Sequence, residues 1–338
     1  MTHATPLSIT WQDGQLRLLD QRLLPHTVSY LDIENAEQAC EAINTLAVRG
    51  APAIGIAAAY GLVVAMDGVD EADSAHFRAE LKRNGDYLVS SRPTAVNLAW
   101  AVRRLQARAE REPTHGAIRA EAEAIHEEDR AICRGIGEQA KDLIAPNANV
   151  LTHCNAGALA VSELGTATAP LYLSHAEGKP FHVYVDETRP LMQGARLTAF
   201  ELHNAGISVE LICDNMAATL MSQSAVDLAI VGTDRVTRNG DVVNKIGTLN
   251  LAVLCNHFGV PFYVACPSST FDPQTPSGAE VVIEERAPEE VLGEHAANVS
   301  VRNPAFDVTP NSLVSGIITE RGVARAPLGD NLAQLLGT

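Results

Sequence analysis

The sequence predicts an α/β protein whose C-terminal part is a Rossmann-like parallel sheet flanked by helices. From residue 149 onward, short β-rich runs alternate with helical patterns, as in a parallel sheet. Several of these runs end in polar residues, as at the ligand-binding edge of such sheets. The preceding residues lack the alternation and indicate a smaller, mainly helical domain with a short antiparallel sheet. We therefore expect an N-terminal domain over 1–130, including a connecting helix, and a Rossmann-like domain over 131–338.

In the first domain, the run from Ile9 to Leu18 is interrupted by Asp13-Gly14, which predicts a β-hairpin. Apolar residues at helical spacing follow over 35–48, 95–110 and 115–144. The last of these segments is rich in alanine and glutamate, and we assign it to the connection between the domains. It contains a GxGxxA pattern at 135–140. A dinucleotide-binding turn must follow a strand, so this pattern inside a helix predicts no nucleotide cofactor.

In the second domain, five strands are predicted, at 149–153, 182–185, 208–212, 227–231 and 261–265. The first leads into Cys154, the second into Asp186-Glu187-Thr188-Arg189, and the fourth into Asp234. Because carboxyl ends of parallel strands meet at one sheet edge, we expect these groups to converge, together with Lys245. A helix that starts at this edge favours an anionic ligand. The alternative is a set of capped helix starts with surface ion pairs.

Composition excludes several classes of protein. The net charge of −16 and the aromatic content of 4% argue against a nucleic-acid surface, which needs clustered cations and stacking rings. The longest apolar run, 53–66, is too short to span a bilayer. The six cysteines form no CxxC pair, so neither a metal site nor a disulfide framework is expected. The first residues lack the pattern of a signal peptide, and we expect a cytoplasmic protein.

Two side chains are candidates for acid–base chemistry. Cys154 lies where a helix dipole would favour its thiolate, although burial would oppose ionisation. Otherwise it is a buried small hydrophobe. That role is the one we expect for Cys213, Cys255 and Cys266. Asp234 directly follows an apolar strand, where partial desolvation would raise its pKa into the range of an acid catalyst. Its alternative role is to cap a turn or to pair with Arg235.

Two arginines are candidates for binding phosphate. Arg49 precedes Gly50-Ala51-Pro52, where the glycine would let the backbone approach a ligand and a helix start would supply N–H donors. Arg92 lies in a similar setting at the start of a helix. The alternative for both is an ordinary turn with a solvated arginine.

Taken together and in this order, the motifs resemble the methylthioribose-1-phosphate isomerase family. They are RGAP at 49–52, RP at 92–93, THCN at 152–155, DETRP at 186–190, QGAR at 193–196, DR at 234–235, NGD at 239–241 and NKIGT at 244–248. The resemblance extends over almost the whole chain. It departs from the family pattern at Phe200 and Thr233, where we would expect tryptophan and alanine.

The resemblance implies a homodimeric enzyme of methionine salvage that needs no cofactor or metal. Its reaction would convert 5-methylthioribose 1-phosphate, an aldose, into 5-methylthioribulose 1-phosphate. It implies that Cys154 and Asp234 are catalytic. It implies substrate binding by Arg49, Gly50, Ala51, Arg92, Gln193, Asn244 and Lys245. The alternatives are an isomerase of 5-deoxyribose 1-phosphate or ribose 1,5-bisphosphate, or a non-catalytic regulatory subunit resembling those of translation initiation factor 2B.

Overall fold

The structure is a computed structural model that describes residues 5–93, 95–293 and 299–337. Its contacts divide the chain into two units. The N-terminal unit consists of Pro6–Ala131 and Ala158–Gly165, and the C-terminal unit of Thr5, Ile132–Gly157 and the described residues from Thr166 onward.

The segment Ala158–Gly165 departs from the division that the sequence predicts, because we had placed it in the C-terminal domain. The main-chain oxygen of Leu159 accepts hydrogen bonds from Ser8 Oγ (2.6 Å) and Gln21 Nε2 (2.8 Å). These bonds fix the segment to the small N-terminal sheet. Side chains more than a hundred residues away hold this loop, and local sequence patterns do not reveal such contacts.

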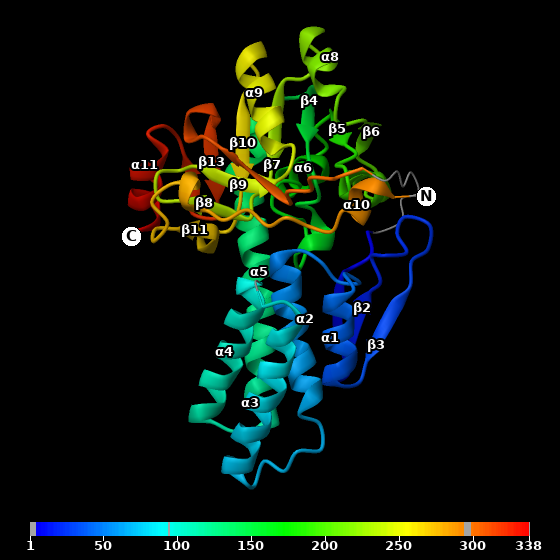
Figure 1. Cartoon of the computed structure of the whole chain (residues 1–338), viewed down its shortest axis with the longest axis vertical. Helices are drawn as coiled ribbons and strands as arrows, with labels where there is room; N and C mark the ends of the chain where they lie inside the picture. The colour runs from blue at the N-terminus through cyan, green and yellow to red at the C-terminus, as the bar shows by residue number, and fades with distance from the viewer. Residues whose placement is uncertain (1–4, 94, 294–298, 338) are drawn as a thin grey trace. The chain divides into compact units, whose positions relative to one another are not determined.

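The N-terminal unit contains a three-stranded antiparallel sheet and a group of helices (Figure 1). Its strands are β1 (Ile9–Gln12), β2 (Gln15–Leu19) and β3 (Tyr30–Ile33), and its helices are α1 (Ala36–Asn44), α2 (Ala51–Ala65), α3 (Ser74–Ser91), α4 (Val96–Arg111) and the start of α5 (His115–Ala140). Asp13 and Gly14 both have positive φ, as a two-residue hairpin turn requires, so the predicted hairpin is confirmed. Helix α2 is apolar around its whole circumference and packs against α1, α3 and α4, which makes it the centre of this core.

The C-terminal unit is built on a seven-stranded sheet with the order β14-β13-β10-β7-β4-β5-β6. Its strands are β4 (Ala148–Thr152), β5 (Phe181–Asp186), β6 (Ser208–Ile212), β7 (Leu228–Val231), β10 (Phe262–Ala265), β13 (Gly316–Thr319) and β14 (Gly322–Ala324). All neighbours are parallel except β13 and β14. The five predicted strands are all present within one residue of the expected bounds, so the Rossmann-like sheet is confirmed.

The sheet order places a topological switch point between β4 and β7. From β4 the chain adds β5 and β6 on one side, then returns to place β7 on the other. Ligands bind in the crevice that such a reversal opens at the carboxyl ends of the strands. Every residue of β7 is buried, so this part of the sheet is a rigid base for whatever follows it.

A second sheet, with the order β11-β8-β9-β12, lies in the same unit and was not predicted. Its strands are β8 (Arg235–Thr237), β9 (Val242–Lys245), β11 (Phe271–Asp272) and β12 (Phe306–Thr309). The remaining helices are α6 (Ala169–Ala176), α7 (Ala199–Asn204), α8 (Ala217–Ser222), α9 (Thr248–Phe258), α10 (Glu289–Leu292) and α11 (Leu328–Leu336). Short helical turns occur at η1 (Lys141–Leu143), η2 (Ala158–Ala160), η3 (Gly194–Thr198), η4 (Ser268–Thr270), η5 (Gly278–Glu280) and η6 (Asn311–Leu313). In the part of the chain that is described, no helix combines the length and apolarity needed to cross a bilayer.

Candidate active site

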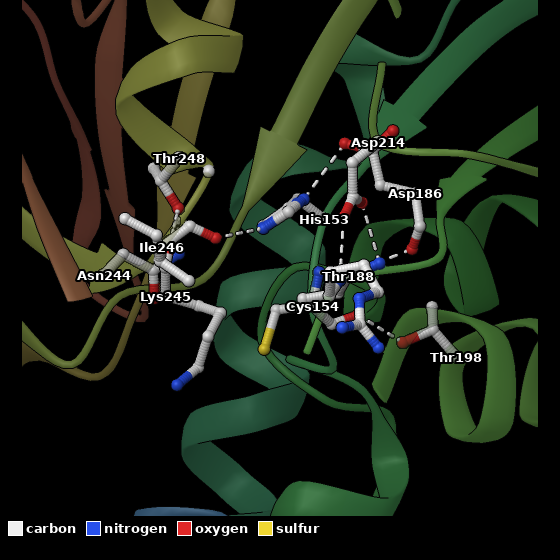
Figure 2. Close-up of polar contacts among 12 residues, drawn as sticks. His153, Cys154, Asp186, Thr188, Thr198, Asp214, Asn244, Lys245, Ile246 and Thr248 are labelled. Carbon is white, nitrogen blue, oxygen red and sulfur yellow. Dashed lines mark hydrogen bonds and ion pairs between the residues drawn. The ribbon is translucent and has the colours of Figure 1, made fainter. Parts of the chain in front are cut away.

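Cys154 follows β4 at the switch point and has a strained backbone, with φ of 65°. Its N–H donates to Thr188 Oγ1 (2.8 Å), and its carbonyl accepts from Thr198 Oγ1 (2.6 Å; Figure 2). Both threonines are buried. A residue with a Cβ in the left-handed region costs about 1–3 kcal/mol and persists only where its surroundings impose it. The two threonine hydroxyls therefore help to hold the thiol-bearing residue in an unfavourable conformation at the strand end.

Thr188 is itself held by the ends of β5 and β6. Its N–H donates to Asp214 Oδ1 (2.8 Å), and its hydroxyl donates to the main-chain oxygen of Asp186 (3.1 Å). The second carboxylate oxygen of Asp214 accepts the N–H of Arg189 (2.7 Å). This network extends from β6 through β5 to Cys154, so three neighbouring strand ends fix the position of the cysteine.

His153, which precedes Cys154, does not serve it as a base. Its Nδ1 lies 3.0 Å from Asp186 Oδ2 and its Nε2 lies 2.9 Å from the main-chain oxygen of Ile246 (Figure 2). Burial disfavours the charged ring, but the hydrogen bond and charge of Asp186 outweigh it and raise the pKa of His153. Burial raises the pKa of Asp186 against the opposing effect of His153. Both directions disfavour loss of a proton from the pair.

His153, Asp186 and Asp214 also have the residue types of a metal site, with one donor atom from each within 4.8 Å of the others. The histidine nitrogens, however, are bonded to Asp186 and Ile246, and both oxygens of Asp214 accept main-chain N–H groups. A cation would have to displace these bonds. The arrangement therefore fits a hydrogen-bond network better than a metal centre.

Asp234 follows β7 across the switch point from Cys154, and its N–H donates to the oxygen of Val243 (3.0 Å). It is exposed, so the expectation that it is partly desolvated is wrong for the chain by itself. The guanidinium of Arg235 pairs with Asp272 (2.9 Å). The hydroxyl of Thr233 lies 2.8 Å from the oxygen of Val243 and accepts the N–H of Arg235 (3.2 Å), which gives this departure from the family pattern a role in the turn.

Gln193, Asn244 and Lys245 are three of the predicted substrate residues. Gln193 is buried, and its Oε1 has no hydrogen-bond partner among the described residues. Asn244 donates from Nδ2 to Thr248 Oγ1 (2.9 Å). Lys245 donates to the oxygen of Ala305 (2.9 Å). Gln193 and Lys245 line one small cavity, so they are close enough to contact the same ligand.

The helix that follows β5 begins with an irregular turn. Gln193 leads into a π-helical turn, η3, which continues as α7. Such turns are rare and often occur at functional sites. Here the turn places Gln193 before Thr198. One segment therefore supplies a candidate substrate-binding side chain and one of the hydroxyl groups that hold Cys154.

Arg49, Gly50, Ala51 and Arg92 belong to the N-terminal unit. Gly50 is the N-cap of α2, with φ of 93°, and a Cβ there would lie 2.2 Å from the oxygen of Ala160. The glycine is therefore required by the backbone at 160, whereas we had expected it to admit a ligand. Arg92 is the C-cap of α3 and comes before α4. Arg49 and Arg92 are both half-buried.

The other cysteines follow the prediction in part. Cys255 and Cys266 are buried, and burial raises the pKa of each thiol to about 12. Cys213 is only half-buried, which corrects our expectation of a core residue. It directly precedes Asp214, and the charge of Glu187 is the largest cause that raises its pKa.

The fold and these residues define a Rossmann-like α/β protein with a polar site at the switch point. The chain belongs to the Initiation factor 2 subunit family, whose family model matches residues 47–326. It is 50% identical to a methylthioribose-1-phosphate isomerase of Symbiobacterium thermophilum, over 98% of this chain and 95% of the relative. It is 51% identical to a 5-deoxyribose 1-phosphate isomerase of Moorella thermoacetica, over 97% of each. The crystal structure of 5-methylthioribose 1-phosphate isomerase from Pyrococcus horikoshii superposes with a TM-score of 0.95 at 40% identity, over 99% of this chain and 97% of the other.

Proposed function

We propose that this chain is an aldose–ketose isomerase that converts 5-methylthioribose 1-phosphate into 5-methylthioribulose 1-phosphate. The observation that carries the proposal is the strained Cys154, bonded through its backbone to two buried threonines at the switch point of the sheet. Backbone strain at a strand end is a feature of functional sites. The names of relatives at about half identity over nearly the whole chain support the substrate class.

Ring opening is the first chemical requirement. A sugar with phosphate on its anomeric oxygen cannot open as a free hemiacetal does, so an acid must protonate the ring oxygen. We assign this role to Asp234, across the switch point from Cys154. Because Asp234 is exposed in the free chain, bound substrate must desolvate it before its pKa rises into the range of an acid catalyst.

Transfer of hydrogen from C2 to C1 is the second requirement. Cys154 would carry it as a proton. The C2–H bond breaks to give an enediol-like intermediate whose O1 bears the phosphate, and a C1–H bond then forms as the hydroxyl on C2 loses its proton to become the ketone. Lys245 and Asn244 are suited to stabilise the oxygen that gains charge, and the unpartnered Gln193 Oε1 can accept from a sugar hydroxyl. The alternative is a direct hydride shift from C2 to C1 beside a polarising thiol.

Phosphate binding is assigned to Arg49 and Arg92, with the first N–H groups of α2 at Ala51 as further donors. Gly50 would contribute its main chain. The proposed enzyme needs no nucleotide or metal, because acid, transfer group and phosphate-binding cations all come from these side chains.

Three further features belong to the proposal. A homodimer follows from the family resemblance and is tested by light scattering, which should give twice the mass of the chain. Participation in methionine salvage follows from the proposed substrate. A cytoplasmic location fits cysteines that form no disulfide bond, as is usual in reducing compartments.

The substrate is tested by comparing kcat/KM for three sugars, with no nucleotide or metal added. We expect 5-methylthioribose 1-phosphate to be isomerised in preference to ribose 1,5-bisphosphate, because an apolar pocket would have to desolvate a second phosphate. A 5-deoxyribose 1-phosphate isomerase is the second candidate, favoured by the Moorella relative, and a higher kcat/KM for that sugar would establish it. A preference for the bisphosphate overturns the proposal. Absence of activity on all three would favour a regulatory subunit.

The route of the hydrogen is tested in deuterated water. If Cys154 acts as a base whose proton exchanges with solvent, the product gains deuterium at C1. Complete retention of the hydrogen from C2 supports a hydride shift or a fully shielded proton.

A further inference from the structure

His153 connects three segments of the C-terminal unit that are distant in sequence. Its ring spans from the end of β5, through Nδ1 and Asp186 Oδ2 (3.0 Å), to the turn after β9, through Nε2 and the oxygen of Ile246 (2.9 Å). Since β5 belongs to the seven-stranded sheet and β9 to the four-stranded sheet, one buried side chain joins the two sheets.

The turn after β9 is shaped to receive this ring. Gly247 has φ of 102°, and a Cβ there would lie 2.8 Å from His153 Cε1, so only glycine allows the ring to lie against the turn. The N–H of Gly247 donates to Asp307 Oδ2 (2.8 Å), which holds the turn from the other side. The contact between His153 and this turn is therefore close and has little freedom.

The hydrogen-bond partners of His153 determine how many protons the pair carries. A main-chain oxygen can only accept, so Nε2 must donate to Ile246. At 3.0 Å, a second proton must lie between Nδ1 and Asp186 Oδ2. The pair therefore has no net charge, whether the proton belongs to the ring or to the carboxyl group. Removing this proton would leave a lone pair of Nδ1 facing a carboxylate.

We propose that His153 and Asp186 are positioning residues whose hydrogen bond helps to fix Cys154 relative to Lys245. Cys154 directly follows His153, and Lys245 directly precedes Ile246. The bond between the His153 ring and Ile246 thus joins the residue next to Cys154 to the residue next to Lys245. In Figure 2 the side chains of Cys154 and Lys245 extend to the same side of the bond between His153 and Ile246. The inference rests on the proposed function, in which both groups act on one sugar.

A purely structural role would be served better by apolar residues. A buried polar pair loses solvation that its mutual attraction only partly restores, and well-packed hydrophobic residues of similar volume are often at least as stable. Asp186 Oδ1 is moreover buried without a hydrogen-bond partner among the described residues. A pocket of about 190 Å³ is lined by both His153 and Asp186, so the pair lies at the edge of a space that a ligand can enter.

The test compares Asp186→Ala with Asp186→Asn. An asparagine amide can donate to Nδ1 while Nε2 still donates to Ile246, so it restores the bridge without a shared proton. We expect Asp186→Ala to reduce kcat about 100-fold with KM changed less than threefold, since small misplacements of reacting groups have effects of this size. The kcat of Asp186→Asn should be at least tenfold higher than that of Asp186→Ala. The matched control is His182→Gln, which removes a histidine of β5 that bonds Ser208 (2.9 Å) outside the site.

A second readout needs no substrate, so it separates this inference from the proposed function. Amide hydrogen exchange should become at least tenfold faster in Asp186→Ala at both 152–157 and 246–250, and should be restored in Asp186→Asn. If Asp186→Ala does not fold, His153→Gln takes its place in both measurements. The glutamine amide keeps a donor for the main-chain oxygen of Ile246, while the contact with Asp186 is lost. Unchanged exchange in the two segments, or equal losses of kcat in the alanine and asparagine variants, would overturn the positioning role.

Discussion

Replacing Thr188 with valine tests whether the strained conformation of Cys154 matters for turnover. Valine has nearly the shape of threonine, but it removes the acceptor of the Cys154 N–H (2.8 Å) and the donor to the oxygen of Asp186 (3.1 Å). A buried polar group that loses its partner costs about 1–3 kcal/mol. That is as large as the strain of about 1–3 kcal/mol stored in a left-handed non-glycine residue. Without Thr188, the loop can therefore relax to another conformation.

We expect Thr188→Val to lower kcat about 100-fold, because a displaced thiol no longer meets its substrate, while KM changes by a smaller factor. Thr188→Ser is the matched control. It keeps the hydroxyl and loses one buried methyl group, at a cost of about 0.5–1.5 kcal/mol of stability, and its kcat should stay within about threefold of the wild type. Steady-state kinetics and urea unfolding of both variants measure the two effects separately. If kcat of the valine variant equals that of the serine variant, the hydroxyl does not position Cys154.

Four other substitutions test the site more simply. Cys154→Ser and Asp234→Asn should keep the fold by circular dichroism and lose about 10²–10⁴-fold in kcat, since proton-transfer groups contribute that much; near-normal turnover removes the residue from the mechanism. Arg92→Ala should weaken substrate binding by about 1.5–3 kcal/mol in a calorimetric titration, and unchanged affinity would refute its contact with phosphate. Gly50→Ala should lower the melting temperature even without substrate, because its Cβ would lie 2.2 Å from the oxygen of Ala160, whereas a glycine needed only for ligand approach would affect binding alone.

The large sheet could be predicted from the sequence, and the small one could not. Strands such as β7 and β10 are buried on both faces, so they read as continuous apolar runs between helical patterns. The four-stranded sheet consists of strands of 2–4 residues, which are too short for a periodicity to be recognised. Its pairing is also non-local, since β9 pairs with β12 some sixty residues later. For this reason Asn244 and Lys245 were identified only through their motif, and the strand that carries them was not predicted.

The candidate residues also divide into those that could be predicted from the sequence and those that could not. Cys154 and Asp234 were predicted because they follow strands whose ends meet at the switch point. The partners that hold Cys154 could not be predicted, because the role of Thr198 depends on a hydrogen bond across 44 residues and on the π-helical turn before it. The close approach of Ala160 to Gly50 could not be predicted either, and the expected approach of a ligand to Gly50 stays a prediction. A glycine in the sequence indicates a close approach without revealing what approaches.

The bonding of His153 limits what Cys154 can do. An adjacent histidine and cysteine suggest a thiol activated by an imidazole base, but here both ring nitrogens are bonded elsewhere. A thiolate at Cys154 would therefore depend on the cations of the site for its stability. If these groups do not ionise the thiol, it remains a neutral polar group, and the hydrogen must then move from C2 to C1 as a hydride. The bonds of His153 thus make ionisation of Cys154, rather than its position alone, the property that decides between the two routes.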